Sequence, residues 1–299
     1  MSIKVESISK IYGKQKALNN VSFEVNSGEI VGFLGPNGAG KSTMMKILTC
    51  YLPQSSGKAS VCNYDVEKES MEVKKCVGYL PEHNPLYLEM YVKEYLAFVG
   101  GLHGLKKVSE RVKEMISLTG LEIEQKKKIG ALSKGFRQRV GLAQALIHDP
   151  KVLIMDEPTT GLDPNQLEEI RSLIKSVGKE KTVLLSTHIM QEVEAVCDRI
   201  LIINHGEITA DGKINELKNN NEKQNFIVQF DKEISKSSIL RINGVVSALL
   251  LKDNRWKVTS SEDIRKQLFN LALENGAGVL ELTAESQKME DLFKEKTGK

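Results

Sequence analysis

The most informative stretch of the chain is Gly35-Pro36-Asn37-Gly38-Ala39-Gly40-Lys41-Ser42-Thr43. It fits the phosphate-loop pattern G-x-x-x-x-G-K-[ST], and it lies between a predicted apolar strand and a predicted helix. Gly38 and Gly40 let successive backbone N–H groups face one anion, and the helix adds the positive end of its dipole. Lys41 would reach the outer phosphates, and Ser42 would offer its hydroxyl to Mg²⁺. The stretch therefore predicts a nucleoside triphosphate site in which all nine residues are candidate contacts.

A second apolar strand, predicted at Val152–Met155, ends in Asp156 and Glu157. An acid at the carboxyl end of a strand beside a phosphate loop can hold Mg²⁺, which is the role expected of Asp156. Glu157 lies one residue further on and would polarise an attacking water. The two acids therefore indicate an enzyme that hydrolyses its nucleotide.

Composition and charge limit the other possibilities. The 299 residues are 40% hydrophobic and 27% charged, as in soluble globular proteins, and the length allows two domains. The net charge of +3 argues against a nucleic-acid binder, which would carry a large basic excess. No apolar run approaches the ~20 residues of a membrane helix, and the amino terminus lacks the apolar core of a signal peptide. We therefore expect a cytoplasmic protein that does not itself cross a membrane.

Apolar strands alternate with helical stretches over the first ~215 residues, which is typical of a buried, largely parallel sheet covered by helices. The predicted strands are Val21–Val25, Ile30–Leu34, Val77–Leu80, Val152–Met155, Val183–Ser186 and Ile200–Asn204. The predicted helices are Lys41–Tyr51, Val92–Leu102, Arg111–Leu118, Phe136–Ile147, Gln166–Val177 and Met190–Val196. This alternation predicts an α/β nucleotide-binding domain over residues 1–218.

The polar segment Glu216–Gln224, with Asn219, Asn220 and Asn221 in a row, predicts a linker. The order of elements after it is β-α-β-β-α-β, which matches a ferredoxin-like unit. The ranges are Phe226–Asp231, Ser235–Ile242, Val245–Leu251, Arg255–Ser260, Asp263–Asn275 and Val279–Thr283, followed by an amphipathic helix at Gln287–Lys296. We therefore expect a small α+β accessory domain at 224–299.

The stretch Leu132-Ser133-Lys134-Gly135-Phe136-Arg137-Gln138-Arg139 precedes the strand that ends in the two acids. It resembles the signature of ATP-binding cassette (ABC) ATPases, whose usual form is LSGGQ. Ser133 and Gly135 match that form, whereas Lys134 and Phe136 depart from it. A Ser hydroxyl and a Gly N–H at a helix N-terminus also suit an anion. Residues 1–215 are thereby identified as similar to the ATP-binding subunits of ABC transporters.

Other family elements follow in the expected order. Tyr12 resembles the aromatic residue that stacks on adenine, Gly161-Leu162-Asp163 resembles the D-loop, and His188 resembles the switch histidine that contacts the γ-phosphate. The resemblance implies a mixed sheet with a helical signature subdomain, and it implies binding of ATP and Mg²⁺. It also makes Glu157, His188 and Lys41 the catalytic candidates, with Ser133, Gly135 and Asp163 contacting nucleotide.

One position departs from the family. The family carries Gln between the phosphate loop and the signature, and the matching stretch here is Gly78-Tyr79-Leu80-Pro81-Glu82. The carboxylate of Glu82 can still accept a hydrogen bond from a Mg²⁺-bound water, which would add it to Ser42 and Asp156 as a metal-shell residue. The alternative is that Glu82 is only a helix-start acid after Pro81.

The resemblance also implies partners. In this family, two copies sandwich two ATP molecules, each between the phosphate loop of one copy and the signature of the other. The chain would therefore need a second ATP-binding subunit, most simply another copy of itself. An integral membrane permease would be a separate chain at the Glu82–Tyr95 surface, and it would hold the subunit at the inner face of the cell membrane.

The segment Tyr79–Tyr87 and the trailing module resemble multidrug and exporter subunits and, among these, the gliding-motility (GldA) ATP-binding subunits of Bacteroidota. This resemblance implies that the transport is export. A soluble ABC ATPase in a non-transport role, for example on ribosomes, is the alternative. A GTPase is disfavoured because the sequence has no [NT]-K-x-D motif.

Overall fold

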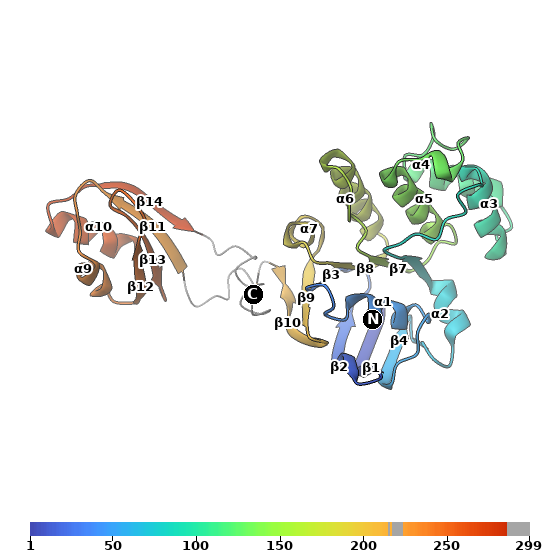
Figure 1. Cartoon of the computed structure of the whole chain (residues 1–299), viewed down its shortest axis with the longest axis horizontal. Coiled ribbons are helices and arrows are strands. Elements are labelled where there is room, and N and C mark those ends of the chain that lie inside the picture. The colour runs from blue at the N-terminus through green and yellow to red at the C-terminus, as the bar shows by residue number, and fades with distance from the viewer. Residues whose placement is uncertain (215, 217–223, 286–299) are drawn as a thin grey trace. The chain divides into compact units, whose positions relative to one another are not determined.

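The computed structural model describes residues 1–214, 216 and 224–285 (Figure 1). These residues form two compact units, one over Met1–Ile214 and a smaller one that contains 224–285. Most of the predicted linker, including Asn219–Asn221, and the helix predicted at Gln287–Lys296 lie outside the described residues. No helix in the described ranges is long and apolar enough to cross a bilayer.

A six-stranded sheet forms the centre of the larger unit, in the order β10-β9-β3-β8-β7-β6. Neighbouring strands are parallel, except that β10 pairs antiparallel with β9 at one edge. The bounds are β3 Ile30–Leu34, β6 Val77–Leu80, β7 Val152–Asp156, β8 Thr182–Thr187, β9 Arg199–Asn204 and β10 Glu207–Lys213. Every residue of β3, β7 and β8 is buried, which explains why these strands are continuous apolar runs in the sequence.

A second, antiparallel sheet has the order β2-β1-β4-β5. Its strands are β1 Ile3–Tyr12, β2 Gln15–Val25, β4 Ser56–Val61 and β5 Tyr64–Asp65. The predicted strand Val21–Val25 was therefore too short. Along β2, exposed polar residues interrupt the buried ones, so only its apolar end stands out in the sequence.

The helices of the larger unit are α1 Lys41–Leu48, α2 Ser70–Cys76, α3 Val92–Leu102, α4 Val108–Leu118, α5 Lys134–Leu146, α6 Pro164–Gly178 and α7 Met190–Val196, with a 3₁₀ turn at Ile129–Ala131. Helix α1 ends before the predicted Tyr51. Cys50 adopts a left-handed φ of 58°, and the N–H of Tyr51 donates back to the Lys46 carbonyl at 2.8 Å. This turn closes the carboxyl end of the helix.

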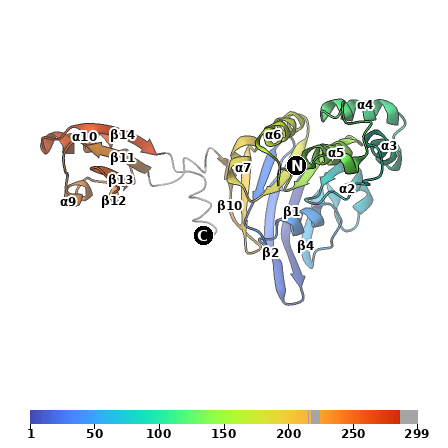
Figure 2. The ribbon, with the colours of Figure 1, turned by 45° about the horizontal axis from the view of Figure 1, so that its top comes forward.

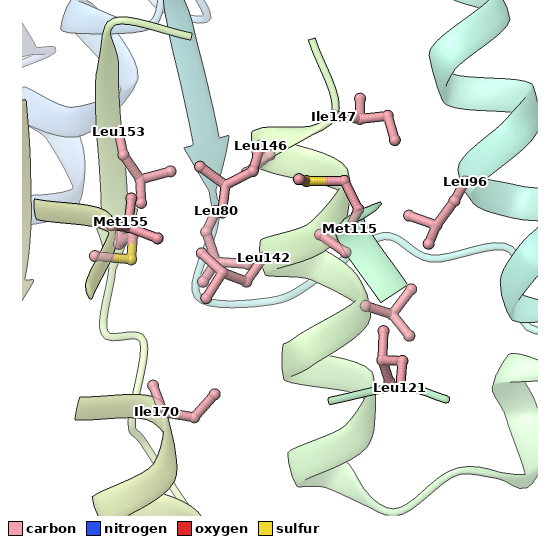
Figure 3. Packing of buried hydrophobic residues seen from close by; sticks show 14 of the residues in the cluster. Leu80, Leu96, Met115, Leu121, Leu142, Leu146, Ile147, Leu153, Met155 and Ile170 are labelled. Atoms are coloured by element: carbon pink, nitrogen blue, oxygen red, sulfur yellow. The ribbon is translucent and has the colours of Figure 1, made fainter. Parts of the chain in front are cut away.

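Helices α3, α4 and α5 lie together beside the six-stranded sheet (Figure 2). Leu142 and Leu146 of α5 face Leu80 of β6, and Met115 of α4 and Leu96 of α3 lie on the other side of α5 (Figure 3). All five side chains are buried, and each contributes about 1.5–3 kcal/mol of transfer free energy. This packing holds α5, which carries the signature-like stretch, against the sheet.

The smaller unit contains β11 Gln224–Phe230, α9 Lys236–Leu240, β12 Val245–Leu250, β13 Arg255–Ser260, α10 Arg265–Glu274 and β14 Val279–Glu285. Its sheet has the order β12-β13-β11-β14, and all neighbours are antiparallel. This is the topology of the predicted ferredoxin-like unit. Phe226, Val228, Trp256 and Leu268 belong to a hydrophobic core of its own.

Candidate functional site

The loop between β3 and α1 has the backbone that an anion-binding turn needs. Gly38 and Gly40 have φ values of 81° and 108°, in the left-handed region that favours glycine. A Cβ at Gly40 would lie 2.5 Å from the Ala17 carbonyl oxygen, so the position has no room for a larger residue. The buried Lys41 ammonium donates to the Gly35 and Pro36 carbonyls at 2.8 and 3.3 Å. The loop thus holds the positive charge of Lys41 through two of its own backbone carbonyls.

A cavity of about 540 Å³ opens on this loop, and we call it the nucleotide cavity. It is within the size range of small-molecule sites. Its lining contains Tyr12, Gln15, Ala17, Asn37, Gly38, Gly40, Lys41, Ser42, Thr43, Glu82, Glu157, Thr160 and His188. Of the predicted loop contacts, Gly35 and Pro36 offer their carbonyls to Lys41, and Ala39 is buried. The fold therefore brings residues from both ends of the larger unit to one cavity.

Glu157 and His188 meet in the nucleotide cavity. Oε2 of Glu157 lies 2.9 Å from Nδ1 of His188 and accepts a hydrogen bond from Thr160 Oγ1 at 3.2 Å. Oε1 of Glu157 lies 3.3 Å from the Lys41 ammonium, and both side chains are over 90% buried. Glu157 has a φ of 50°, which interrupts the strand conformation directly after Asp156. Glu157 therefore lines the nucleotide cavity, whereas its neighbour Asp156 does not.

Ser42, Glu82 and Asp156 line a second cavity of about 630 Å³ together, and Ser42 and Glu82 also line the nucleotide cavity. Asp156 is buried, and its carboxylate accepts a hydrogen bond from the Ser186 hydroxyl. All three side chains offer oxygen atoms, the ligands that Mg²⁺ prefers. These three residues are therefore the candidates for holding Mg²⁺ in the second cavity.

Glu82 is exposed and makes no hydrogen bond or ion pair with the described part of the chain. Residues 81–91 form no helix, and α3 begins only at Val92. The alternative that Glu82 is a helix-start acid was therefore wrong. Its carboxylate is free to take a ligand at the place where both cavities meet.

Tyr79 of β6 lines the second cavity, and sequence reasoning did not single it out as a site residue. Its hydroxyl is buried and has no hydrogen-bond partner within the described residues. Burial, together with the negative charge of Asp156, raises the pKa of Tyr79. The hydroxyl therefore keeps its proton and can donate it to an acceptor in this cavity.

Ser133, Gly135 and Asp163 lie on neither cavity lining. Ser133 caps α5 by accepting from the Phe136 N–H at 3.4 Å, and Asp163 caps α6 by accepting from the Gln166 N–H at 2.9 Å. Gly135 packs against Gln166, since a Cβ added at Gly135 would lie 2.4 Å from Oε1 of Gln166. The signature-like and D-loop-like stretches thus pack against each other, while Ser133, Gly135 and Asp163 stay outside the lining of this chain's own nucleotide cavity.

Thr160 and Ser186 are site residues that sequence reasoning missed. Ser186 pairs with Asp156 in the β7–β8 register, and its carbonyl and hydroxyl oxygens accept from the Glu157 N–H at 3.1 and 3.2 Å. The available signal was the polar pair Ser186-Thr187 at the end of an apolar strand. Which strand lies beside it could not be read from the sequence.

Known proteins are similar to this chain in sequence and in fold. The model of the ABC transporter family matches residues 18–160. The bacitracin transport ATP-binding protein BcrA of Bacillus licheniformis is 32% identical over 97% of this chain and 95% of its own length. The chain belongs to the ABC transporter family. Another ABC relative, the Nod factor export ATP-binding protein I of a Rhizobium species, is 38% identical over 71% of each chain.

A similar ABC protein of known structure contains bound nucleotide. It is a dimeric ATP-binding cassette in a post-hydrolysis state, bound to ADP and phosphate, with a TM-score of 0.66 and 27% identity. The match covers 71% of this chain and 98% of that one. The predicted cassette fold is thereby confirmed. The protein is the ATP-binding subunit of an ABC transporter and hydrolyses ATP.

Proposed function

We propose that this ABC subunit works as a homodimer at the inner face of the cell membrane and powers export through a separate permease. The observation that carries the proposal is the divided site. One chain supplies the phosphate loop, Glu157 and His188 in a single cavity, while the exposed Ser133 and the buried Gly135 line neither this cavity nor the second one. Two copies would complete each other's sites. The name of one relative, the Nod factor export ATP-binding protein I, supports the direction of transport.

In this proposal, each predicted residue has one task. Lys41 and the loop N–H groups hold the phosphates, which would replace the contacts that Lys41 now makes with loop carbonyls and with Glu157. Tyr12 is 46% exposed at the end of β1 and offers its ring to adenine. Ser133, Gly135 and Asp163 would contact the nucleotide held by the partner subunit.

Hydrolysis would proceed at the pair formed by Glu157 and His188. Glu157 would orient a water and accept its proton, and the imidazole of His188, hydrogen-bonded to Glu157, would contact the γ-phosphate. Mg²⁺, held by Ser42 and Asp156 with Glu82 in its outer shell, would neutralise phosphate charge when bound. Burial of Lys41 and Glu157 strengthens these electrostatic contacts.

Copurification tests the role in transport. A tagged full-length chain recovered from membranes of its source cells should bring down a hydrophobic integral membrane protein. Recovery on ribosomes with no membrane partner would favour the non-transport role instead.

A narrower form of the proposal, based on the resemblance of Tyr79–Tyr87, assigns the exporter to gliding motility. In that case, deletion of the gene should stop gliding, and the Glu157→Gln variant should fail to restore it.

Glu82 provides a test of the Mg²⁺ site. Glu82→Gln keeps an acceptor oxygen, so basal ATPase activity should change by only a few-fold, on the order of 1 kcal/mol in the barrier. Glu82→Ala removes the acceptor and should raise the Mg²⁺ concentration needed for the half-maximal rate. A Mg²⁺ titration of the purified variants measures this. If the curves of Glu82→Ala and the wild type overlay, Glu82 has no part in the metal shell.

The separate cores of the two units lead to a further expectation. A chain that ends after Lys218 should fold and bind ATP with an affinity within about three-fold of the full-length protein, because the hydrophobic clusters of residues 1–214 need no residue of the smaller unit. Circular dichroism and equilibrium binding of a fluorescent ATP analogue would check this. An unfolded or nonbinding fragment would place the domain boundary elsewhere.

A further inference from the structure

Glu192 of α7 is a buried carboxylate that lies outside both cavities. Only 3% of the residue is exposed. Its Oε1 accepts a hydrogen bond from Thr159 Oγ1, and its Oε2 accepts one from Thr187 Oγ1 at 2.6 Å. Thr159 and Thr187 are themselves buried, so this carboxylate is satisfied inside the protein by two hydroxyls. Burying a charge is costly, and an apolar side chain would pack in α7 without that cost.

The two threonines belong to the two segments that carry the proposed catalytic pair. Thr159 follows Glu157 by two residues, and Thr187 directly precedes His188. Because Glu157 and His188 are joined at 2.9 Å, the contacts form a closed ring that runs from Glu157 through Thr159, Glu192 and Thr187 to His188. The ring joins the end of β7 to the end of β8.

A second contact holds the segment around His188. Thr187 Oγ1 accepts from the Ile189 N–H at 3.1 Å while it donates to Glu192. The hydroxyl thus joins the backbone that follows His188 to the carboxylate. Glu192 is therefore connected through Thr187 to the backbone on both sides of His188.

We propose that Glu192 is a positioning residue for ATP hydrolysis, which sets the separation and orientation of Glu157 and His188 by holding Thr159 and Thr187. The proposal rests on the roles assigned above to Glu157 and His188. Glu192 lines neither the nucleotide cavity nor the second cavity, so it acts on the geometry of the reacting groups and not on nucleotide affinity.

The chemistry of the contacts defines the variants. Two threonine hydroxyls donate to two carboxylate oxygens, and a hydroxyl can also accept. Glu192→Gln therefore keeps both contacts, provided that one threonine reverses its role and accepts from the new amide. Glu192→Leu fills a similar volume and loses both contacts. Thr187→Val removes one donor at nearly constant shape, and Thr159→Val removes the other.

Steady-state ATPase assays of the full-length protein test the proposal. Glu192→Leu should lower kcat by about 10- to 100-fold, the expected cost of misplaced reacting groups, while the dissociation constant for ATP changes less than about two-fold. Glu192→Gln should retain most of the wild-type kcat. The control is Glu180→Leu, which replaces an exposed carboxylate before the opposite end of β8 and should match the wild type.

A double-mutant cycle identifies the route. If Glu192 acts through Thr187, the Thr187→Val/Glu192→Leu double variant should be no slower than Glu192→Leu alone. Thermal unfolding confirms that each variant is folded. Should Glu192→Leu fail to fold, the same drop in kcat at unchanged ATP affinity is expected from Thr159→Val and Thr187→Val, and wild-type rates in both would overturn the proposal.

The Glu157→Gln variant separates failure of this proposal from failure of the assigned site. If Glu157→Gln is inactive but folded Glu192→Leu hydrolyses ATP at the wild-type rate, the positioning role is wrong and the site stands. If kcat and ATP affinity of Glu192→Leu fall in parallel, Glu192 is structural only. Wild-type activity in Glu157→Gln would remove the basis of both.

Discussion

Glu157→Gln should bind ATP and leave it uncleaved, with the ATPase rate reduced at least about 100-fold, the usual contribution of a general base. The amide keeps the shape of the side chain and can still hydrogen-bond to His188 and Thr160, but it cannot take a proton from water. The change also removes the negative charge 3.3 Å from the Lys41 ammonium, which should favour bound phosphate.

With the chemistry blocked, the closed pair should accumulate. Size-exclusion chromatography of Glu157→Gln should show a dimer with ATP and a monomer with ADP or without nucleotide, while the wild type returns to monomer as it consumes ATP. Glu180→Gln, the same change at an exposed position, serves as the matched control. An unchanged ATPase rate in Glu157→Gln would contradict its assignment as the base.

Mixed dimers should recover an activity that neither parent has. Lys41→Ala deletes a charge-assisted contact to phosphate, worth about 1.5–3 kcal/mol, and should abolish hydrolysis by weakening ATP binding. Ser133→Arg places a bulky cation where the partner's nucleotide would lie, and it should abolish hydrolysis in its own homodimer. The heterodimer of the two variants keeps one wholly intact site. In that site, the Ser133→Arg chain supplies an unchanged phosphate loop and the Lys41→Ala chain supplies an unchanged signature.

Mixing the two purified variants with ATP should therefore restore part of the wild-type rate, as measured by phosphate release. Two differently tagged Lys41→Ala preparations, mixed in the same way, provide the control and should stay inactive. If tag-based capture proves that the heterodimer forms and no activity returns, the site is not built across two chains.

Local features of this protein could be predicted from the sequence. The phosphate loop is one such feature, because Gly38, Gly40 and Lys41 are neighbours whose backbone freedom and charge act within a single turn. The fully buried strands β3, β7 and β8 are another, since burial on both faces produces continuous apolar runs. The order of the motifs then indicated the ABC family, and the comparisons agree.

Features that depend on which strands lie side by side required the tertiary structure. The β7–β8 register puts Ser186 against Asp156, and the ring through Glu192 joins segments that carry no common motif. The position of Glu82 between two cavities, and not at a helix start, likewise follows from how the chain packs. Residue type and spacing determine what a side chain can do, but hydrogen bonds between distant residues form only where the folded chain brings donor and acceptor together.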